Sequence, residues 1–183
     1  FKNKPHQDDP DVVGPIAADC DGALGELVIH YKTDAAPVVE RPYRDFLTAL
    51  GPDVTVHVLC PGVADLDDLK ARVGKVQCAL NPVFVDHPMT AWARDRWFAL
   101  QLSHRGGQRI TLVSPQGELG AESWPERKGD EQSGEDLARA LGESVVALRS
   151  DLYFDGGDIV ADSETAFVTP SVLQRNLGQS VQT

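Results

Sequence analysis

Two acidic segments carry the residue types best suited to chemistry: Trp92–Trp97 (WARDRW) and Asp155–Asp158 (DGGD). A guanidinium is planar and permanently charged, and it presents paired N–H donors that match the two oxygens of a carboxylate. Two or three carboxylates in one pocket can therefore grip a guanidinium from different edges. The two segments predict such a cation site, with Asp95 and Asp155 as its ligands.

The neighbours of these two carboxylates fit the same interpretation. The indole rings of Trp92 and Trp97 can stack on a cation or wall its pocket. Gly156 and Gly157 allow the backbone to approach another group closely or to adopt a positive φ. Each segment also has a simpler explanation that stays open: a surface ion-pair cluster at 94–96, and a tight turn between strands at 155–158.

The elements that must position these residues follow from the apolar patterns. We expect strands at 25–31, 54–59, 81–86, 97–102, 109–113, 145–148, 153–160 and 165–168. Helical spacing predicts helices at 38–50, 65–73 and 135–141, with residues 118–134 irregular and Ser171 capping a final helix. Short strands and helices thus alternate in two cycles, roughly strand, helix, strand, strand. This predicts an α/β protein with two repeated modules, whose open faces need neighbours to cover them.

Composition excludes several classes of function. The chain has 17 basic and 28 acidic residues, which argues against nucleic acid or an anionic membrane as a partner. It has no apolar run long enough for a transmembrane helix. The three cysteines, Cys20, Cys60 and Cys78, are odd in number and lack C-x-x-C spacing, which argues against a disulfide framework or a zinc site. We therefore expect a buried, inert Cys60, no metal site and a reducing, cytoplasmic setting.

The order of the motifs resembles that of the guanidino-group modifying enzymes, which include the agmatine, arginine and peptidyl-arginine deiminases and the dimethylarginine hydrolases. The matching segments are 92–95, 155–160, 167–170 and 175–176, and the resemblance spans roughly residues 25–176. It implies the pentein fold, a five-bladed α/β propeller whose modules surround a central site. The chain would then divide into a flexible arm (1–23), a partial pentein domain of about two modules (24–176) and the truncated start of another module (177–183).

The same resemblance implies a role for each matching residue. Asp95 would hold the substrate guanidinium, and Asp155 would contact it where the family often has glutamate. Trp92 would border the substrate. Arg94, Gly156, Gly157 and Asp158 would support the site, and Arg175 and Asn176 would be structural. The family needs no cofactor and takes a small guanidine, such as agmatine or arginine, or an arginine side chain as its substrate.

Catalysis in this family requires a nucleophilic cysteine, which forms a thiouronium intermediate, and a histidine that acts as acid and base. No His or Cys follows Asp158 in this sequence, so both are expected beyond Thr183. His6 lies in the N-terminal arm, His30 and His57 lie in strands as partly buried or solvent-facing residues, and His87 can border the pocket. We therefore expect this chain to be the N-terminal part of a guanidine deiminase or hydrolase and to be catalytically inactive in isolation. One alternative is a non-catalytic binding or assembly module that pairs with itself or with a complementing C-terminal chain, and another is an unrelated small α/β domain whose motifs match by chance.

Overall fold

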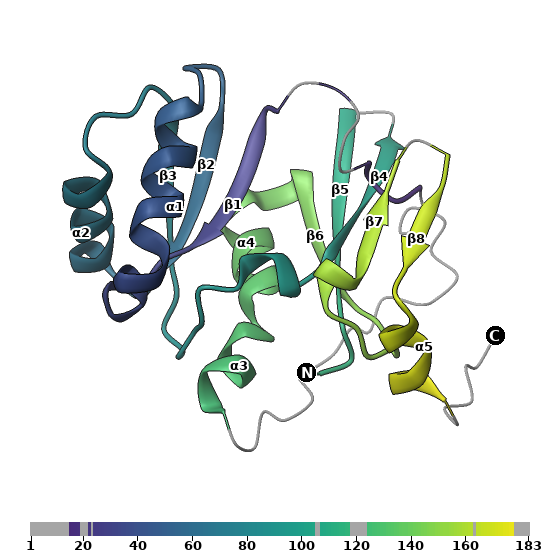
Figure 1. Cartoon of the computed structure of the whole chain (residues 1–183). Coiled ribbons are helices and arrows are strands. Elements are labelled where there is room, and N and C mark those ends of the chain that lie inside the picture. Colours follow the sequence, from purple (N-terminus) through teal and green to yellow (C-terminus); the bar gives the residue numbers. More distant parts are fainter. Residues whose placement is uncertain are drawn as a thin grey trace.

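Two three-stranded sheets and a two-stranded hairpin form the frame of the structure (Figure 1). The structure is a computed structural model, and it describes residues 15–18, 22, 24–104, 107–117, 124–162 and 164–177. Helices lie beside both sheets, so the predicted mixed α/β class is confirmed. None of the described helices is long and apolar enough to cross a membrane.

The first sheet is entirely parallel. It contains β1 (Glu26–His30), β2 (Thr55–Cys60) and β3 (Ala79–Phe84) in that order. Parallel neighbours need a crossover, which α1 (Ala36–Ala49) and α2 (Val63–Val73) provide. The strand order β1-β2-β3 places both crossovers in the same direction, and both helices pack on one face of the sheet, side by side (Figure 1).

The central strand β2 is buried on both faces. Val56, Val58 and Cys60 pack into the core beneath α1 and α2. Leu59 points to the opposite face and packs with Leu112 of the second sheet. Side chains alternate along a strand, so this single strand joins the two cores of the molecule.

The second sheet mixes strand directions. β4 (Phe98–His104) and β5 (Gly107–Ser114) form an antiparallel pair, and β6 (Val145–Arg149) adds parallel to β5. The crossover from β5 to β6 carries α3 (Pro125–Asp130) and α4 (Ser133–Leu141). The apolar side of α4 packs into the core between the two sheets.

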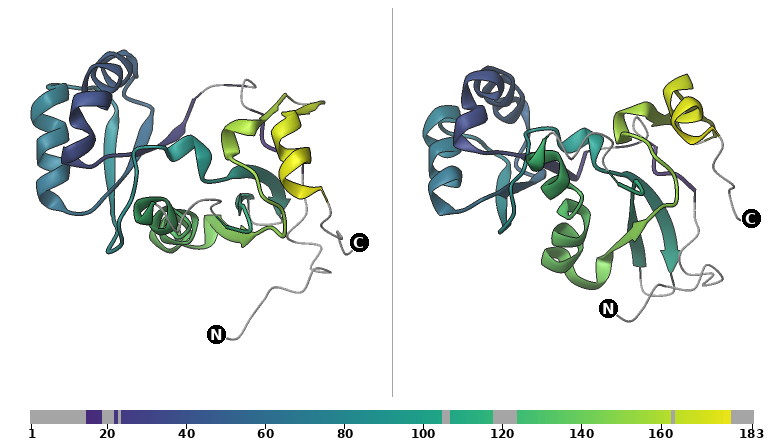
Figure 2. Two further views of the ribbon diagram at one scale, coloured as in Figure 1. Left: turned by 60° about the horizontal axis from the view of Figure 1, so that its bottom comes forward. Right: turned by 90° about the horizontal axis from the view of Figure 1, so that it is seen from below.

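A hairpin and a short helix complete the fold. β7 (Ile159–Ala161) and β8 (Ala166–Val168) pair antiparallel, and α5 (Pro170–Asn176) follows. Phe154 and Val172 join the apolar core between this unit and the second sheet. Figure 2 shows the unit at the end of the molecule opposite α1 and α2.

Four 3-10 turns lie between the described elements. Two of them precede strands and carry the acidic motifs: η2 (Ala93–Asp95) leads into β4, and η4 (Gly156–Asp158) leads into β7. The others are at Thr33–Ala35 and Gly142–Ser144. Asp95 therefore lies in a tight turn just before a strand, and Asp155 is the N-cap residue of another such turn.

Three expected elements differ in the structure. The described part of 118–134 forms α3 and the first residues of α4, because Pro125 can open a helix and an acidic first turn suits its dipole. Only the last residues of 153–160 are a strand, since the glycines form η4. Ser171 lies inside α5, whose N-cap position is Thr169.

The order of elements also departs from the expected repeat. A helix follows each of the first two strands of the first sheet, whereas the second sheet begins with a strand hairpin. Most of the N-terminal arm lies outside the described residues, but the backbone carbonyl of Pro15 accepts a hydrogen bond from Gln101. Ile16 forms a bridge with Leu100. The described part of the arm thus extends the edge of β4.

Candidate functional site

The turns η2 and η4 touch through their backbones. A Cβ atom on Gly156 would lie 2.3 Å from the carbonyl oxygen of Trp97 and 2.4 Å from that of Arg94. Only glycine permits this approach. The Arg94 guanidinium also donates a hydrogen bond to the carbonyl oxygen of Ile159, at 2.7 Å. Close approach was one of the two predicted uses of the glycines; the other, a positive φ, is wrong for this pair.

The contact between the turns brings the two predicted carboxylates together around one cation. Arg127, on α3, donates from Nη1 to Oδ2 of Asp95 at 3.2 Å. It donates from Nη2 to Oδ1 of Asp155 at 3.1 Å. A guanidinium of the chain itself therefore lies between Asp95 and Asp155, and both carboxylates are only partly exposed.

Asp155 is held in place from its other side. Its Oδ2 pairs with Nη1 of Arg175 at 2.9 Å, and the same nitrogen pairs with Asp158 at 3.0 Å. Asp155 and Asp158 also form a capping box across η4, in which each side chain accepts from the other's backbone N–H. These contacts fix the carboxylate of Asp155 whether or not Arg127 is present.

Asp158 supports this turn through its own hydrogen bonds. Burial alone would raise its pKa, but hydrogen bonds from Thr169 and Ser171 and the charge of Arg175 hold the pKa below its usual range. Asn176 bonds both the backbone N–H and the carbonyl of Tyr153. A supporting role for Asp158 and Asn176 stays a prediction, and Arg175 contacts Asp155 of the candidate site directly.

Asp95 is anchored by a buried network behind it. Arg96 is 2% exposed and approaches Asp95 and Asp130, each at 3.5 Å. Asp130 also accepts hydrogen bonds from the backbone and hydroxyl of Thr90, at 2.9 and 2.6 Å. Burial raises the pKa of Asp130, although the charge of Arg96 opposes the shift. The surface ion-pair interpretation of 94–96 is wrong for Arg96, which is among the most buried side chains of the described residues, whereas Arg94 is exposed.

The helix that carries Arg127 is attached to the same network. Asp130 is its last residue, so the bonds to Thr90 tie α3 to the loop before η2. A Cβ on Gly129 would lie 1.7 Å from the carbonyl oxygen of Pro88. The helix therefore packs directly against this loop, which sets the position from which Arg127 reaches the carboxylates.

His30 also belongs to this buried network, through Thr90 and Asp130. Its Nδ1 lies 3.1 Å from the carbonyl oxygen of Thr90, which can only accept, so Nδ1 carries the hydrogen. The side chain is completely buried, and burial lowers the pKa of His30 to about 3. His30 and His57 were expected to be partly buried or solvent-facing; both are buried instead.

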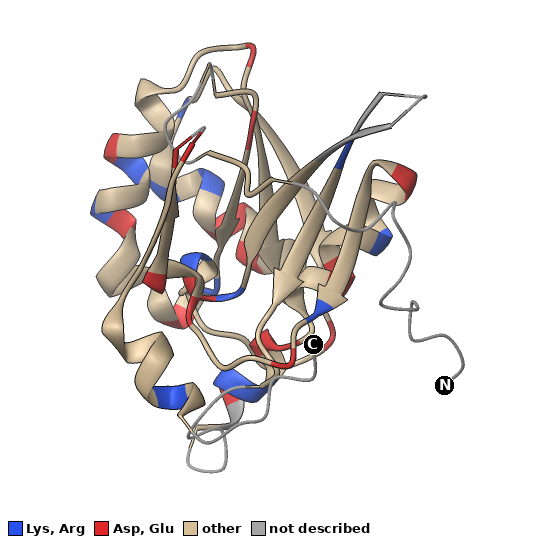
Figure 3. Ribbon diagram, turned by 90° about the vertical axis from the view of Figure 1, so that its right-hand side faces the viewer, with Lys and Arg blue, Asp and Glu red and all other residues tan. Residues whose placement is uncertain are grey.

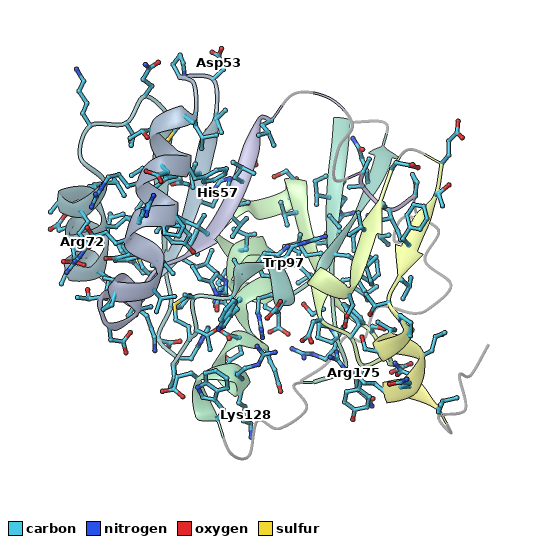
Figure 4. All side chains as sticks on the ribbon, in the orientation of Figure 1. Asp53, His57, Arg72, Trp97, Lys128 and Arg175 are labelled. Atoms are coloured by element: carbon cyan, nitrogen blue, oxygen red, sulfur yellow. The ribbon has the colours of Figure 1, made fainter. Side chains whose placement is uncertain are left out.

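The two tryptophans of the first motif have different environments. Trp97 packs against the core with its ring 6.2 Å from that of His30. Figure 4 shows Trp97 near the middle of the molecule. The expected stacking of Trp97 on a ligand is therefore not supported. Trp92 is 55% exposed beside Asp95, so its contact with a ligand stays a prediction.

The remaining histidine and cysteine side chains have other partners or surroundings. His87 bonds Asp136 at 2.6 Å. Cys60 and Cys78 are buried, and burial raises the pKa of the Cys60 thiol to about 11, as expected for an inert cysteine. Cys20 and His6 lie outside the described residues. Among the residues that the structure describes, no cluster of three or more His, Cys, Asp or Glu side chains can hold a metal.

The residues that sequence reasoning missed are Arg127 and Asp130. Both belong to the stretch that was expected to be irregular, and their long-range partners give no local pattern. The only available signal was the helix-opening sequence Pro125-Glu126.

Several known structures have a fold similar to that of this chain, although comparison of the sequence alone does not detect such relatives. No protein-family model and no curated protein matches the sequence. An agmatine deiminase of C. jejuni matches with a TM-score of 0.56 and 17% identity, over 85% of this chain and 46% of that chain. A structure assigned as a peptidyl-arginine deiminase gives 0.59 and 14%, over 88% and 48%. One assigned as an arginine deiminase from Porphyromonas gingivalis gives 0.59 and 22%, over 87% and 49%.

The chain shares part of the fold of these deiminase structures. It spans about half the length of the structures it matches, so it corresponds to part of a pentein. A substrate-bound form of the C. jejuni agmatine deiminase is also matched, with a TM-score of 0.52. The pentein resemblance seen in the sequence is thus confirmed at the level of fold.

Proposed function

We propose that this chain forms the part of a pentein-type guanidine deiminase, or of a related hydrolase of guanidine C–N bonds, that holds the guanidinium of the substrate. The observation that carries the proposal is the Arg127 guanidinium between Asp95 and Asp155. It supports a site whose geometry suits a planar cation with two donor edges. In the proposed complex, the substrate takes the place of Arg127.

The two carboxylates have a defined task in this chemistry. Each accepts N–H bonds from a different edge of the guanidinium, which fixes the plane of the group and keeps it charged. The central carbon then faces a nucleophile in one orientation. The resemblance implies attack by a cysteine thiolate, loss of ammonia and hydrolysis of the thiouronium by water, with a histidine moving protons. Both residues are expected beyond Thr183, and the described cysteines, Cys60 and Cys78, are buried.

The chain alone is therefore expected to bind a guanidinium without turning it over. We further propose that its elements form about two modules of a five-module propeller, with the first motif on one module and the second motif at the next. Agmatine is the first ligand to test, because a matched structure is an agmatine deiminase. An arginine side chain is the alternative substrate.

The proposal predicts that Asp95→Asn and Asp155→Asn each weaken agmatine binding about ten- to a hundredfold. The reason is the loss of a charge-assisted hydrogen bond, which contributes about 1.5–3 kcal/mol. Isothermal titration calorimetry of the folded chain measures the effect. Asp67→Asn is the matched control, because Asp67 is an exposed carboxylate on the distant helix α2. Equal dissociation constants for Asp95→Asn and the unchanged chain would refute the proposed site.

An assembly role is the second candidate, and a surface feature favours it. The hairpin and α5 expose large apolar side chains, namely Phe167, Val168, Leu173 and Leu177. Such a face is suited to covering by another module or chain. Sedimentation of the isolated chain distinguishes the cases, since a stable dimer is expected only if the covered area well exceeds about 1,000 Å².

A further inference from the structure

Arg127 occupies the position that the proposed function gives to a substrate. We infer that Arg127 is an internal ligand of the guanidinium site, which competes with external guanidinium compounds and thereby sets their affinity. This inference rests on the proposed function, because it assumes that Asp95 and Asp155 are the ligand-binding carboxylates. It adds a residue to the site that neither acidic motif contains.

The ion pairs of Arg127 are those of a bound ligand rather than of a loose surface contact. The side chain is only 17% exposed, and its two terminal nitrogens reach carboxylates on two different turns. Paired, partly desolvated contacts of this kind are stronger than exposed single ion pairs. The contacts of Arg127 with the two carboxylates are therefore favourable in free energy, and an incoming ligand must displace them.

The carboxylates keep other partners that do not depend on Arg127. Asp155 retains Arg175 and the capping box with Asp158. Asp95 retains Arg96, which is fixed in turn by Asp130. Removal of the Arg127 side chain thus leaves two positioned acceptors facing the same space, which is the environment that an external guanidinium needs.

The arginine can leave the site without unfolding its helix. Asp130 and Gly129 anchor α3 to the loop at 88–90, while the contacts of the guanidinium lie at the end of a long, flexible stem. Because the stem has several rotatable bonds, we expect the Arg127 guanidinium to leave Asp95 and Asp155 while α3 stays in place. Because the competitor is tethered, it is always present at a high effective concentration.

Competition between Arg127 and an external ligand changes the measured dissociation constants in a characteristic way. Only molecules whose site is not occupied by Arg127 can bind a ligand. The apparent dissociation constant therefore equals the intrinsic constant divided by the fraction of such molecules, and this factor is the same for every ligand. Removing the competitor must therefore tighten the binding of all guanidinium ligands by one common factor. The ratio of affinities between two ligands stays unchanged.

The test titrates agmatine and methylguanidine into the unchanged chain, Arg127→Ala and Arg127→Gln. The glutamine variant keeps part of the stem, so the test survives if the alanine variant folds poorly. Lys128→Ala is the matched control, because Lys128 is exposed on the same helix and its loss changes the net charge equally (Figure 4). We expect both Arg127 variants to bind both ligands about tenfold more tightly, as for an internal ion pair of about 1.4 kcal/mol, and Lys128→Ala to change binding less than about twofold.

The other outcomes are each decisive. If the Arg127 variants bind as the unchanged chain does, while Asp95→Asn still weakens binding, the competition is refuted and the proposed function stands. If Lys128→Ala tightens binding as much as Arg127→Ala does, the effect is one of net charge and the inference is again refuted. If the Arg127 variants bind neither ligand, both the inference and the proposed function fail.

Discussion

Replacing Gly156 with alanine is expected to lower the free energy of unfolding by about 3 kcal/mol, whereas Gly157→Ala changes it by less than about 0.5 kcal/mol. A methyl group on Gly156 meets two backbone carbonyl oxygens, at 2.3 and 2.4 Å. Neither can move unless η2 and η4 separate. A methyl group on Gly157 lies 3.6 Å from Asp95 Oδ1, which is an ordinary contact.

The two adjacent glycines therefore form a matched pair for the measurement. Urea unfolding of both variants, followed by circular dichroism, gives the two changes in unfolding free energy. Because the clash pushes apart the turns that carry Asp95 and Asp155, Gly156→Ala is also expected to weaken agmatine binding. Equal stability of the two variants would show that the contact between the turns is looser than in the structure described.

His30 is expected to make the fold sensitive to acid well before the carboxylates titrate. In the unfolded chain its pKa returns to about 6.5, whereas burial holds the folded value at about 3. Between these values the unfolded state binds the extra proton, so the free energy of unfolding falls as the pH falls. The slope from this one group is about 1.4 kcal/mol per pH unit.

The variant that isolates this contribution is His30→Asn. An asparagine amide can still donate to the Thr90 carbonyl but does not titrate. Asp130 lies in the same network, and its raised pKa acts in the opposite direction, since the folded state then takes up a proton first. It is retained in both proteins, so the difference between their slopes reports His30 alone. Unfolding free energies from pH 7 to 4 are expected to fall less steeply for His30→Asn, and parallel curves would contradict the assignment.

The alternation of elements could be predicted from sequence because it depends on local patterns. The strands at β1, β2 and β6 and the helices α1 and α4 follow apolar periodicity that their own residues contain. The helix α3 could not be predicted in this way, because its few residues are held by distant partners of Asp130 and Gly129. Short elements depend on tertiary contacts more than on propensity.

The residues of the candidate site likewise differ in whether local sequence patterns could predict them. Asp95 and Asp155 were identifiable because planar cations need carboxylates and because both lie in distinctive motifs. Arg127 was not, since nothing around it in the sequence indicates a partner. The burial of Arg96 was also missed, because charged residues next to one another usually indicate a solvated surface. Figure 3 shows acidic and basic residues on many of the helices, strands and turns, so the presence of charged residues alone does not mark the site.

The most direct test of the central claim is a crystal structure of the Arg127→Ala chain with agmatine bound. We expect the agmatine guanidinium in the space that Arg127 leaves, with N–H donors within hydrogen-bond distance of both Asp95 and Asp155. Arg175 should still pair with Asp155, as in the unliganded chain. Agmatine bound elsewhere, with neither carboxylate in contact, would contradict the assignment of these residues as a guanidinium site.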